Sequence, residues 1–201
     1  MHYITDTLYW ISTGLLVPVV VLLIWFFLRA LVLLGGWFGH YMDTRRLQAA
    51  LAEPLAGLKG HTQLPDLEAR LGTLKSRQPM ATALRSILEA NNLPLVEKAL
   101  ADFELEAQRD MALGKTLSKM GPMLGLMGTL IPMGPALVGL STGDIASMAY
   151  NMQVAFATTV VGLFSAAVGF VVLQAKQRWY RRDLGALEFV AQLQEQKLQA
   201  L

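Results

Sequence analysis

The sequence has no cysteine among its 201 residues. This absence excludes disulfide bonds, thiolate metal sites, iron–sulfur clusters and a cysteine nucleophile. Charged residues are scarce at 16%, whereas about 25% is usual for a soluble domain. The net charge of +2 gives no electrostatic support for nucleic-acid binding. With so little charge, much of the chain is expected to face something other than water.

Residues arranged for catalysis are also lacking. The histidines His2, His40 and His61 are scattered and do not have the spacing of metal ligands. The Gly-Lys-Thr triplet at 114–116 resembles the end of a P-loop, but Arg109 stands where that motif requires its first glycine. No Ser–His–Asp arrangement suggests itself. We therefore expect no enzymatic activity, no bound metal and no cofactor.

Three long apolar runs are present instead. Apolar residues make up 54% of the chain, and its mean hydropathy is +0.42. A helix needs roughly 20 apolar residues to cross a bilayer core of about 30 Å. We predict membrane spans at 10–38, 121–140 and 148–173, the last two without a charged side chain. In the turn between them, Ser141 and Asp144 stand at capping-box spacing for the third helix.

The distribution of lysine and arginine predicts the orientation. One of the 17 is Arg29, eleven lie between Arg45 and Lys119, and five between Lys176 and Lys197. Cytoplasmic loops carry the excess of positive charge, so the N-terminus is expected outside. The expected external parts are the flank 1–9 and the turn 141–147; the expected cytoplasmic parts are 39–120 and 174–201. Arg29 itself is expected to snorkel to the inner interface, where Trp37, Phe38 and Tyr41 are typical of an aromatic belt.

The cytoplasmic parts are expected to be helical. The segment 39–120 shows no strand-like alternation, and its last part, 95–120, is amphipathic and runs straight into the second span. Helical spacing continues after the third span, over 174–201. Breaks are predicted at Pro54, 57–60, Pro79 and 91–94. The predicted fold class is an all-α integral membrane protein with three transmembrane helices, a helical cytoplasmic loop and a cytoplasmic C-terminal helix.

The second and third spans carry only uncharged polar side chains. Those at membrane depth are Thr129, Gln153, Thr158, Thr159 and Ser165. Such groups must find partners in hydrocarbon, either carbonyls of their own helix or groups on another helix. Thr129 and Thr159 are expected within a turn or two of each other in depth, by the rise of an α-helix. Because neither span has a titratable proton carrier, a carboxylate would have to come from another chain.

Two stretches carry a family resemblance. GPMLGLMGTL at 121–130 resembles the second-span signature of the MotA/TolQ/ExbB proton channel family, and AFATTVVGL at 155–163 is similar to its third-span signature. The predicted topology is also similar to that of the family. The glutamate that ExbB and TolQ carry five residues before the third-span threonine is replaced here by Val154.

The resemblance implies a ring of subunits, taken to be a pentamer, around two copies of a single-span partner like ExbD, TolR or MotB. That partner would supply an aspartate, and ring threonines matching Thr129 and Thr159 would face it, with Thr158 beside them. Small residues at the helix contacts and the lumen are expected at Gly125, Gly128, Pro132 and Gly162.

The expected function is therefore a subunit of a proton-motive-force-driven motor or energy-transducing complex, of the kind that serves ion or protein transport, in the bacterial inner membrane. Two alternatives stay open on the sequence. One is a non-conducting oligomeric scaffold, and the other is a small transporter subunit. Which machine the complex drives, and whether H⁺ or Na⁺ is used, stay open as well.

Overall fold

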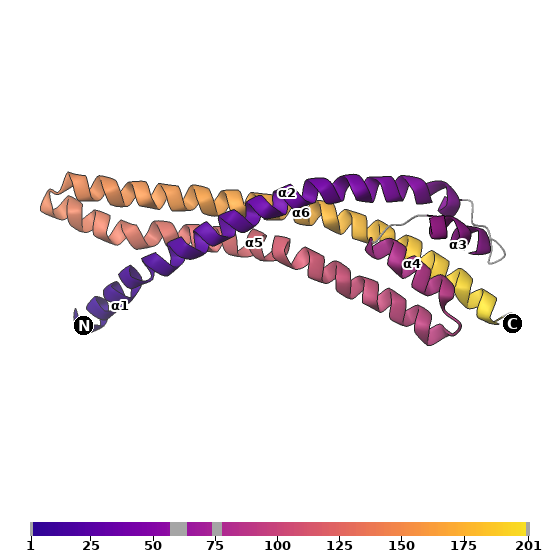
Figure 1. Cartoon of the computed structure of the whole chain (residues 1–201). Coiled ribbons are helices and arrows are strands. Elements are labelled where there is room, and N and C mark those ends of the chain that lie inside the picture. Colours follow the sequence, from indigo (N-terminus) through magenta and orange to yellow (C-terminus); the bar gives the residue numbers. More distant parts are fainter. Residues whose placement is uncertain (1, 57–63, 74–77, 200–201) are drawn as a thin grey trace. The chain divides into compact units, whose positions relative to one another are not determined.

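The computed structural model describes residues 2–56, 64–73 and 78–199, and every regular element in them is an α-helix. The helices, in chain order, are α1 (His2–Gly14), α2 (Leu16–Ala56), α3 (Leu64–Thr73), α4 (Pro79–Glu89), α5 (Leu93–Thr142) and α6 (Ile145–Gln199) (Figure 1). Three stretches are long and apolar enough to cross a membrane: Thr7–Trp37 and parts of α5 and α6. The predictions of an all-α fold and three apolar spans are confirmed.

The chain divides into two compact units. Unit 1 comprises 1–36 and 113–173, and unit 2 comprises 37–112 and 174–201. The predicted spans fall almost entirely within unit 1, whereas most of the lysine and arginine falls within unit 2. The boundaries between the two compact units thus lie close to the boundaries between the apolar, charge-poor segments and the charged segments of the sequence.

The core of unit 1 lies between α2 and α5. One stripe of α2, formed by Val19, Leu23, Phe26 and Ala30, packs against Leu117, Leu124 and Ile131 of α5. These α5 residues recur every seven positions, which keeps them on one face of the helix. Phe27 of α2 also meets Phe164 of α6, with ring centroids 5.6 Å apart.

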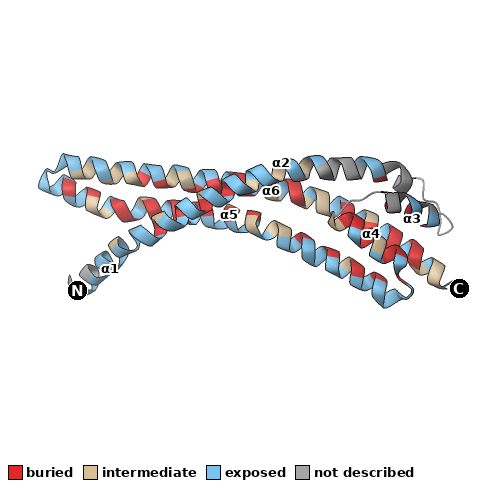
Figure 2. Ribbon diagram, viewed as in Figure 1, coloured by how far each residue is buried: buried red, intermediate tan, exposed pale blue. Residues whose placement is uncertain are grey.

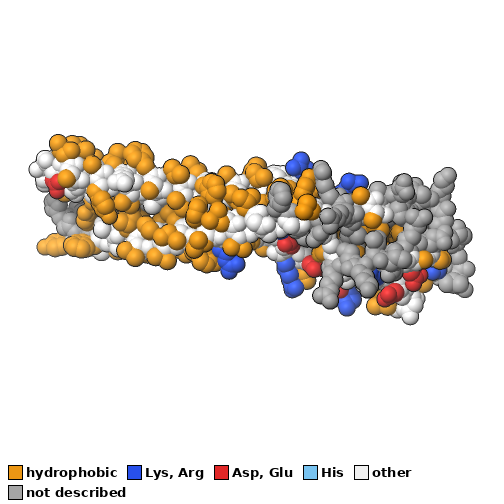
Figure 3. Space-filling view, turned by 45° about the horizontal axis from the view of Figure 1, so that its top comes forward, with side chains coloured by type: hydrophobic (Ala, Val, Ile, Leu, Met, Phe, Trp, Pro, Cys, Tyr) orange, Lys and Arg blue, Asp and Glu red, His pale blue; other side chains and the backbone are white. Residues whose placement is uncertain are grey.

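The outer surface of unit 1 is apolar. Figure 2 shows exposed positions along α5 and α6, and Figure 3 shows hydrophobic side chains over much of this surface. Leu126, Leu130, Phe156 and Val160 are among the exposed large side chains. A contiguous apolar surface of this kind needs lipid or another protein to cover it.

The two helices of the hairpin in unit 1 meet through residues that lack large side chains. A Cβ atom on Gly121 would lie 2.8 Å from the carbonyl oxygen of Gly162, and one on Gly169 would lie 2.7 Å from Cβ of Leu117. Only glycine permits backbones to approach so closely. Gly121, Gly125 and Gly128 of the second span therefore serve the contact between α5 and α6.

The turn of the hairpin is shorter than predicted. α5 continues to Thr142 and α6 begins at Ile145, because the hydroxyls of Ser141 and Thr142 donate to carbonyls of their own helix. Gly143 has φ +75°, a conformation that glycine adopts readily. Asp144 caps α6 by accepting a hydrogen bond from the Ser147 amide at 3.0 Å. The predicted capping box was wrong, since Ser141 belongs to the last turn of α5.

Proline and asparagine place several other helix ends. Pro18 cannot donate to the carbonyl of Gly14, and α1 ends at that residue. Pro79 starts α4, and the Asn92 side chain accepts from the Leu95 amide at the start of α5. The breaks predicted at Pro79 and 91–94 are confirmed. The predicted break at Pro54 was wrong, because α2 continues to Ala56; the break at 57–60 lies outside the described residues.

Unit 2 has its own hydrophobic core. α3, α4, the beginning of α5 and the end of α6 bury Leu67, Leu84, Ile87, Phe103 and Leu187, among others. The Gln194 side chain of α6 donates to the carbonyls of Leu88 and Ala90, which lie at the C-terminal end of α4. Carbonyls at a helix end have no intrahelical partner, so this amide satisfies them and ties α4 to α6.

Candidate functional site

Thr129 and Thr159 are half-buried in unit 1. The Thr129 hydroxyl donates to the Leu126 carbonyl at 2.7 Å, and the Thr159 hydroxyl donates to the Ala155 carbonyl at 2.9 Å. In this rotamer each hydroxyl oxygen still has lone pairs that can accept a hydrogen bond. If the hydroxyl rotates away from its carbonyl, it can donate instead. Each side chain can therefore serve either a protonated carboxyl group or an ionised one.

Thr158 has a different environment from its neighbour. Its side chain is only 7% exposed, and its hydroxyl lies 3.0 Å and 2.9 Å from the carbonyl oxygens of Val154 and Ala155. A Cβ atom on Gly128 would lie 2.6 Å from Cβ of Thr158, so Thr158 packs directly over Gly128. Thr158 is thus part of the contact between α5 and α6.

The small residues predicted for packing or for the lumen also lie near this contact. A Cβ atom on Gly162 would lie 2.8 Å from Cα of Gly125, and Pro132 is fully buried. Ser165, on the same face of α6 as Thr158, is fully buried and donates to the Val161 carbonyl at 2.8 Å. Thr158 is thus buried in the contact between the two helices, whereas Thr129 and Thr159 are only half-buried.

The register of α5 against α6 is constant in unit 1. Leu117 contacts Gly169, and Gly128 contacts Thr158. From the first contact to the second, the position on α5 moves forward by eleven residues and the position on α6 moves back by eleven, as it must for antiparallel helices. Because α5 and α6 run antiparallel, Thr129 and Thr159 lie one residue to opposite sides of the Gly128–Thr158 contact, so their positions differ by about 3 Å along the hairpin axis, which is less than one helical turn.

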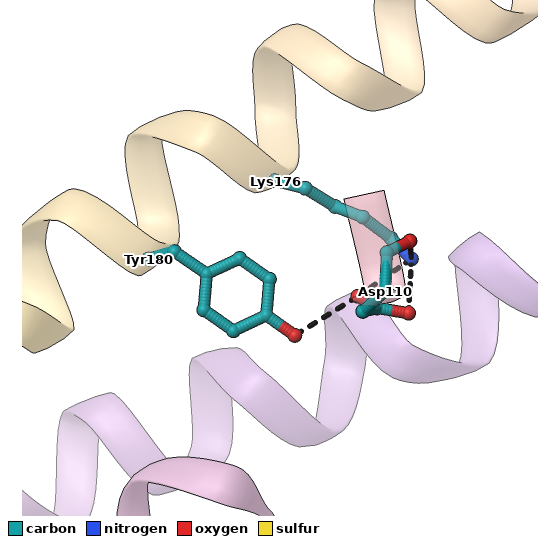
Figure 4. Close-up of polar contacts among 3 residues, drawn as sticks. All are labelled: Asp110, Lys176 and Tyr180. Atoms are coloured by element: carbon teal, nitrogen blue, oxygen red, sulfur yellow. Dashed lines mark hydrogen bonds and ion pairs between the residues drawn. The ribbon is translucent and has the colours of Figure 1, made fainter. Parts of the chain in front are cut away.

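A charged cluster in unit 2 was missed by the sequence reasoning. Figure 4 shows Asp110 of α5 with Lys176 and Tyr180 of α6, which together we call the Asp110 cluster. The Lys176 ammonium lies 2.8 Å and 2.7 Å from the two carboxylate oxygens of Asp110, and the Tyr180 hydroxyl donates to that carboxylate at 2.9 Å. The only sequence signal was the four-residue spacing of Lys176 and Tyr180, which places both on one face of α6.

Tyr180 lies beyond the predicted end of the third span at residue 173. Burial, followed by the charge and hydrogen bond of Asp110, raises the pKa of the Tyr180 phenol above its usual range. The phenol therefore keeps its proton and remains a donor to the carboxylate.

The arginine, aromatic and histidine residues singled out in the sequence belong neither to the threonine pair nor to the Asp110 cluster. The Arg29 guanidinium lies over the Trp25 ring, 5.2 Å from its centroid. In unit 2, Trp37 stacks on Trp179 with centroids 6.3 Å apart, and Tyr41 contacts both rings. His61 lies outside the described residues, as do the side chains of His2, His40 and Phe38. In the described ranges, no group of three or more acidic or histidine side chains could hold a metal ion.

Comparison with known proteins adds one match. The sequence model of the MotA/TolQ/ExbB proton channel family matches residues 72–188, which is more than half of the chain. The matched region contains α4, all of α5 and most of α6, and therefore both threonine positions and the Asp110 cluster. A comparison with curated individual proteins found no match.

Proposed function

Because the chain belongs to the MotA/TolQ/ExbB proton channel family, whose members are subunits of energy-transducing membrane complexes, we propose that its α5 and α6 line a proton path. The observation that carries this proposal is the pair of half-buried hydroxyls, Thr129 and Thr159. They lie at similar height in a stretch whose one charged residue, from 120 to 175, is Asp144 in the turn.

The proton carrier in this proposal is an aspartate of a single-span partner like ExbD, TolR or MotB. A buried ionised carboxylate without donors is strongly disfavoured, and its pKa rises. Thr129 and Thr159 would donate to the ionised form and accept from the protonated form. The carboxyl group could then lose and regain its proton during each cycle.

The assembly proposed is a homo-oligomeric ring, with five subunits by analogy with the family, around that partner. The exposed apolar surface of unit 1 supports burial against lipid and neighbouring subunits. We propose that the N-terminus is external, that unit 2 is cytoplasmic and that the membrane is the bacterial inner membrane. The chain would act without enzymatic activity or cofactor, and its output would be rotation or force.

Proton flux tests the proposal. The chain alone in liposomes with an imposed pH gradient should leak little, and co-reconstitution with the aspartate-bearing partner should raise the flux. The Thr129→Val, Thr159→Val double variant should assemble normally but lose the flux. Thr→Ser variants keep the donor and should retain much of it. Normal flux in the double Val variant would contradict the proposed path.

A non-conducting scaffold is the second candidate. The observation that favours it is that both hydroxyls donate to carbonyls of their own helices, as they would in a purely structural role. A scaffold predicts that the double Val variant loosens assembly slightly and that no flux depends on the partner's aspartate. The same liposome experiment therefore separates the two functions.

A further inference from the structure

The Asp110 cluster joins two helices through an ion pair in which Lys176 is buried and the Asp110 side chain is 37% exposed. Lys176 is 7% exposed, and besides the two carboxylate contacts its ammonium lies 3.4 Å from the Asp110 backbone oxygen. These contacts all go to one residue of the opposite helix. Asp110 and Lys176 are 66 residues apart in sequence, and only the pairing of α5 with α6 brings them together.

An ion pair of this kind is a weak source of folding stability. Removing the Lys176 charge from water costs free energy that its pairing with Asp110 has to offset, and replacing a buried ion pair by apolar residues is often neutral or favourable. The best-attested use of a buried polar or ionic contact between helices is to fix their register. The exposed Lys98–Asp102 pair differs, since both side chains belong to α5 and are 71% and 67% exposed.

The register of the contact between α5 and α6 is set by several features. In unit 1 this contact is made largely of glycine, at Gly114, Gly121, Gly125 and Gly128 of α5 and Gly162 and Gly169 of α6. Two side chains interlock with these glycines, Leu117 with Gly169 and Thr158 with Gly128, and the turn at Gly143 limits slippage at its own end. Away from the turn, an ion pair between the helices adds a directional contact. Hydrophobic burial is non-directional and opposes a shift of one turn only weakly.

We propose that Asp110, Lys176 and Tyr180 are positioning residues that hold α5 and α6 in a single register. Seven residues separate the Asp110–Lys176 contact from the Leu117–Gly169 contact along each helix, so the ion pair keeps the same register as the glycine contact. By this means they keep Thr129 and Thr159 at similar heights, and this consequence rests on the proposed function. A slip of one helical turn would shift one hydroxyl relative to the other by about 5.4 Å along the helix axis.

Disulfide trapping tests the register directly, because the chain has no native cysteine. A Cβ atom on Gly114 would lie 3.4 Å from Cβ of Leu173, and disulfides join Cβ atoms about 3.8 Å apart. The parent for the experiment carries Gly114→Cys and Leu173→Cys in the full chain, with its partner, in membranes. Oxidation should give a high yield of the intramolecular disulfide.

In this parent, Asp110→Asn and Lys176→Met should each reduce the disulfide yield several-fold. The charge swap Asp110→Lys, Lys176→Asp should restore it, and Tyr180→Phe should reduce it less. Lys98→Met is the matched control and should have no effect, because its ion pair lies within one helix. Proton flux measured on the same samples should follow the disulfide yield.

An unchanged disulfide yield in Asp110→Asn and Lys176→Met would overturn the proposal. If those variants fail to accumulate, the charge swap decides: recovery of both accumulation and disulfide supports a positioning role, and failure to recover overturns it. The disulfide readout does not depend on proton flow. If Thr129→Val, Thr159→Val keeps its flux while the disulfide still responds to Asp110→Asn, the proposed function fails and the positioning role stands.

Discussion

Adjacent threonines on one helix have different surroundings in this protein. Thr158 packs over Gly128 in the hairpin contact, whereas Thr159 is half-buried. One helical residue corresponds to a rotation of about 100°, which is enough to separate a packing position from the position that we propose lines the proton path. The hydroxyl chemistry of the two side chains is the same, so their roles are set by what each faces.

Thr158→Val should therefore be tolerated better than Thr159→Val. Valine keeps the branched shape that fills the space over Gly128, and the carbonyls that Thr158 contacts belong to its own helix. We expect near-normal flux and ring yield for Thr158→Val, and lost flux with normal ring yield for Thr159→Val. Equal loss of flux in both variants, measured beside ring yield on native gels, would speak against this division of roles.

Gly128 is a position where an added methyl group should be costly. A Cβ atom there would lie 2.6 Å from both Cβ and Oγ1 of Thr158, closer than atoms can pack. Gly128→Ala should destabilise the chain in detergent by about 1–3 kcal/mol, the usual cost of overpacking. Gly134→Ala is the control on the same helix, since its Cβ would meet only Tyr9, at 3.7 Å. Equal unfolding midpoints for the two variants would refute the tight contact.

At the scale of elements, the hairpin depends on its two-residue turn. The polar run Ser141–Ser147 predicted a long turn because it interrupts the apolar sequence. The hydroxyls of Ser141 and Thr142 instead bond to their own helix, which lets α5 continue through them. α5 likewise contains Pro122, Pro132 and Pro135 without ending. In this hairpin, polar runs and prolines in the sequence therefore predict the ends of helices less reliably than a capping side chain such as that of Asp144 does.

The Asp144 cap should stabilise α6 measurably. Its carboxylate accepts the Ser147 amide and lies at the positive end of the helix dipole. Asp144→Ala should lower stability by about 1 kcal/mol, seen as a reduced unfolding midpoint in detergent. Asp144→Asn keeps an acceptor and should lose much less. Similar losses in both variants would mean that the charge, rather than the capping hydrogen bond, provides the stabilisation.

At the scale of the whole molecule, the two units differ in charge and in surface. Unit 1 exposes large apolar side chains, and unit 2 carries most of the lysine and arginine. This division is what the positive-inside rule requires of a protein whose unit 2 lies in the cytoplasm.

Cysteine labelling tests this orientation. Thr142 and Gln196 are both exposed, and one lies at the hairpin turn while the other lies near the end of α6. In intact cells, Thr142→Cys should react with an impermeant thiol reagent, and Gln196→Cys should react only after permeabilisation. Because the chain lacks cysteine, each signal comes from a single site. If Gln196→Cys reacted in intact cells and Thr142→Cys did not, the topology would be the reverse of the proposed one.

Several features were determined by the sequence alone because their causes are local. Apolar runs determined the three spans, and Pro79 and Asn92 determined where α4 and α5 begin. The signatures at 121–130 and 155–163 were sufficient for the family resemblance, which the match over 72–188 confirms.

The tertiary structure alone decided which residues of different helices contact one another. The pairings of Gly128 with Thr158, Asp110 with Lys176 and Trp37 with Trp179 join residues far apart in sequence. Helical periodicity identifies the buried face of each helix, but it does not say which turn of one helix lies against which turn of the other. That depends on the length of the turn at Gly143 and on close contacts between glycine backbones, and both exist only once the helices have packed.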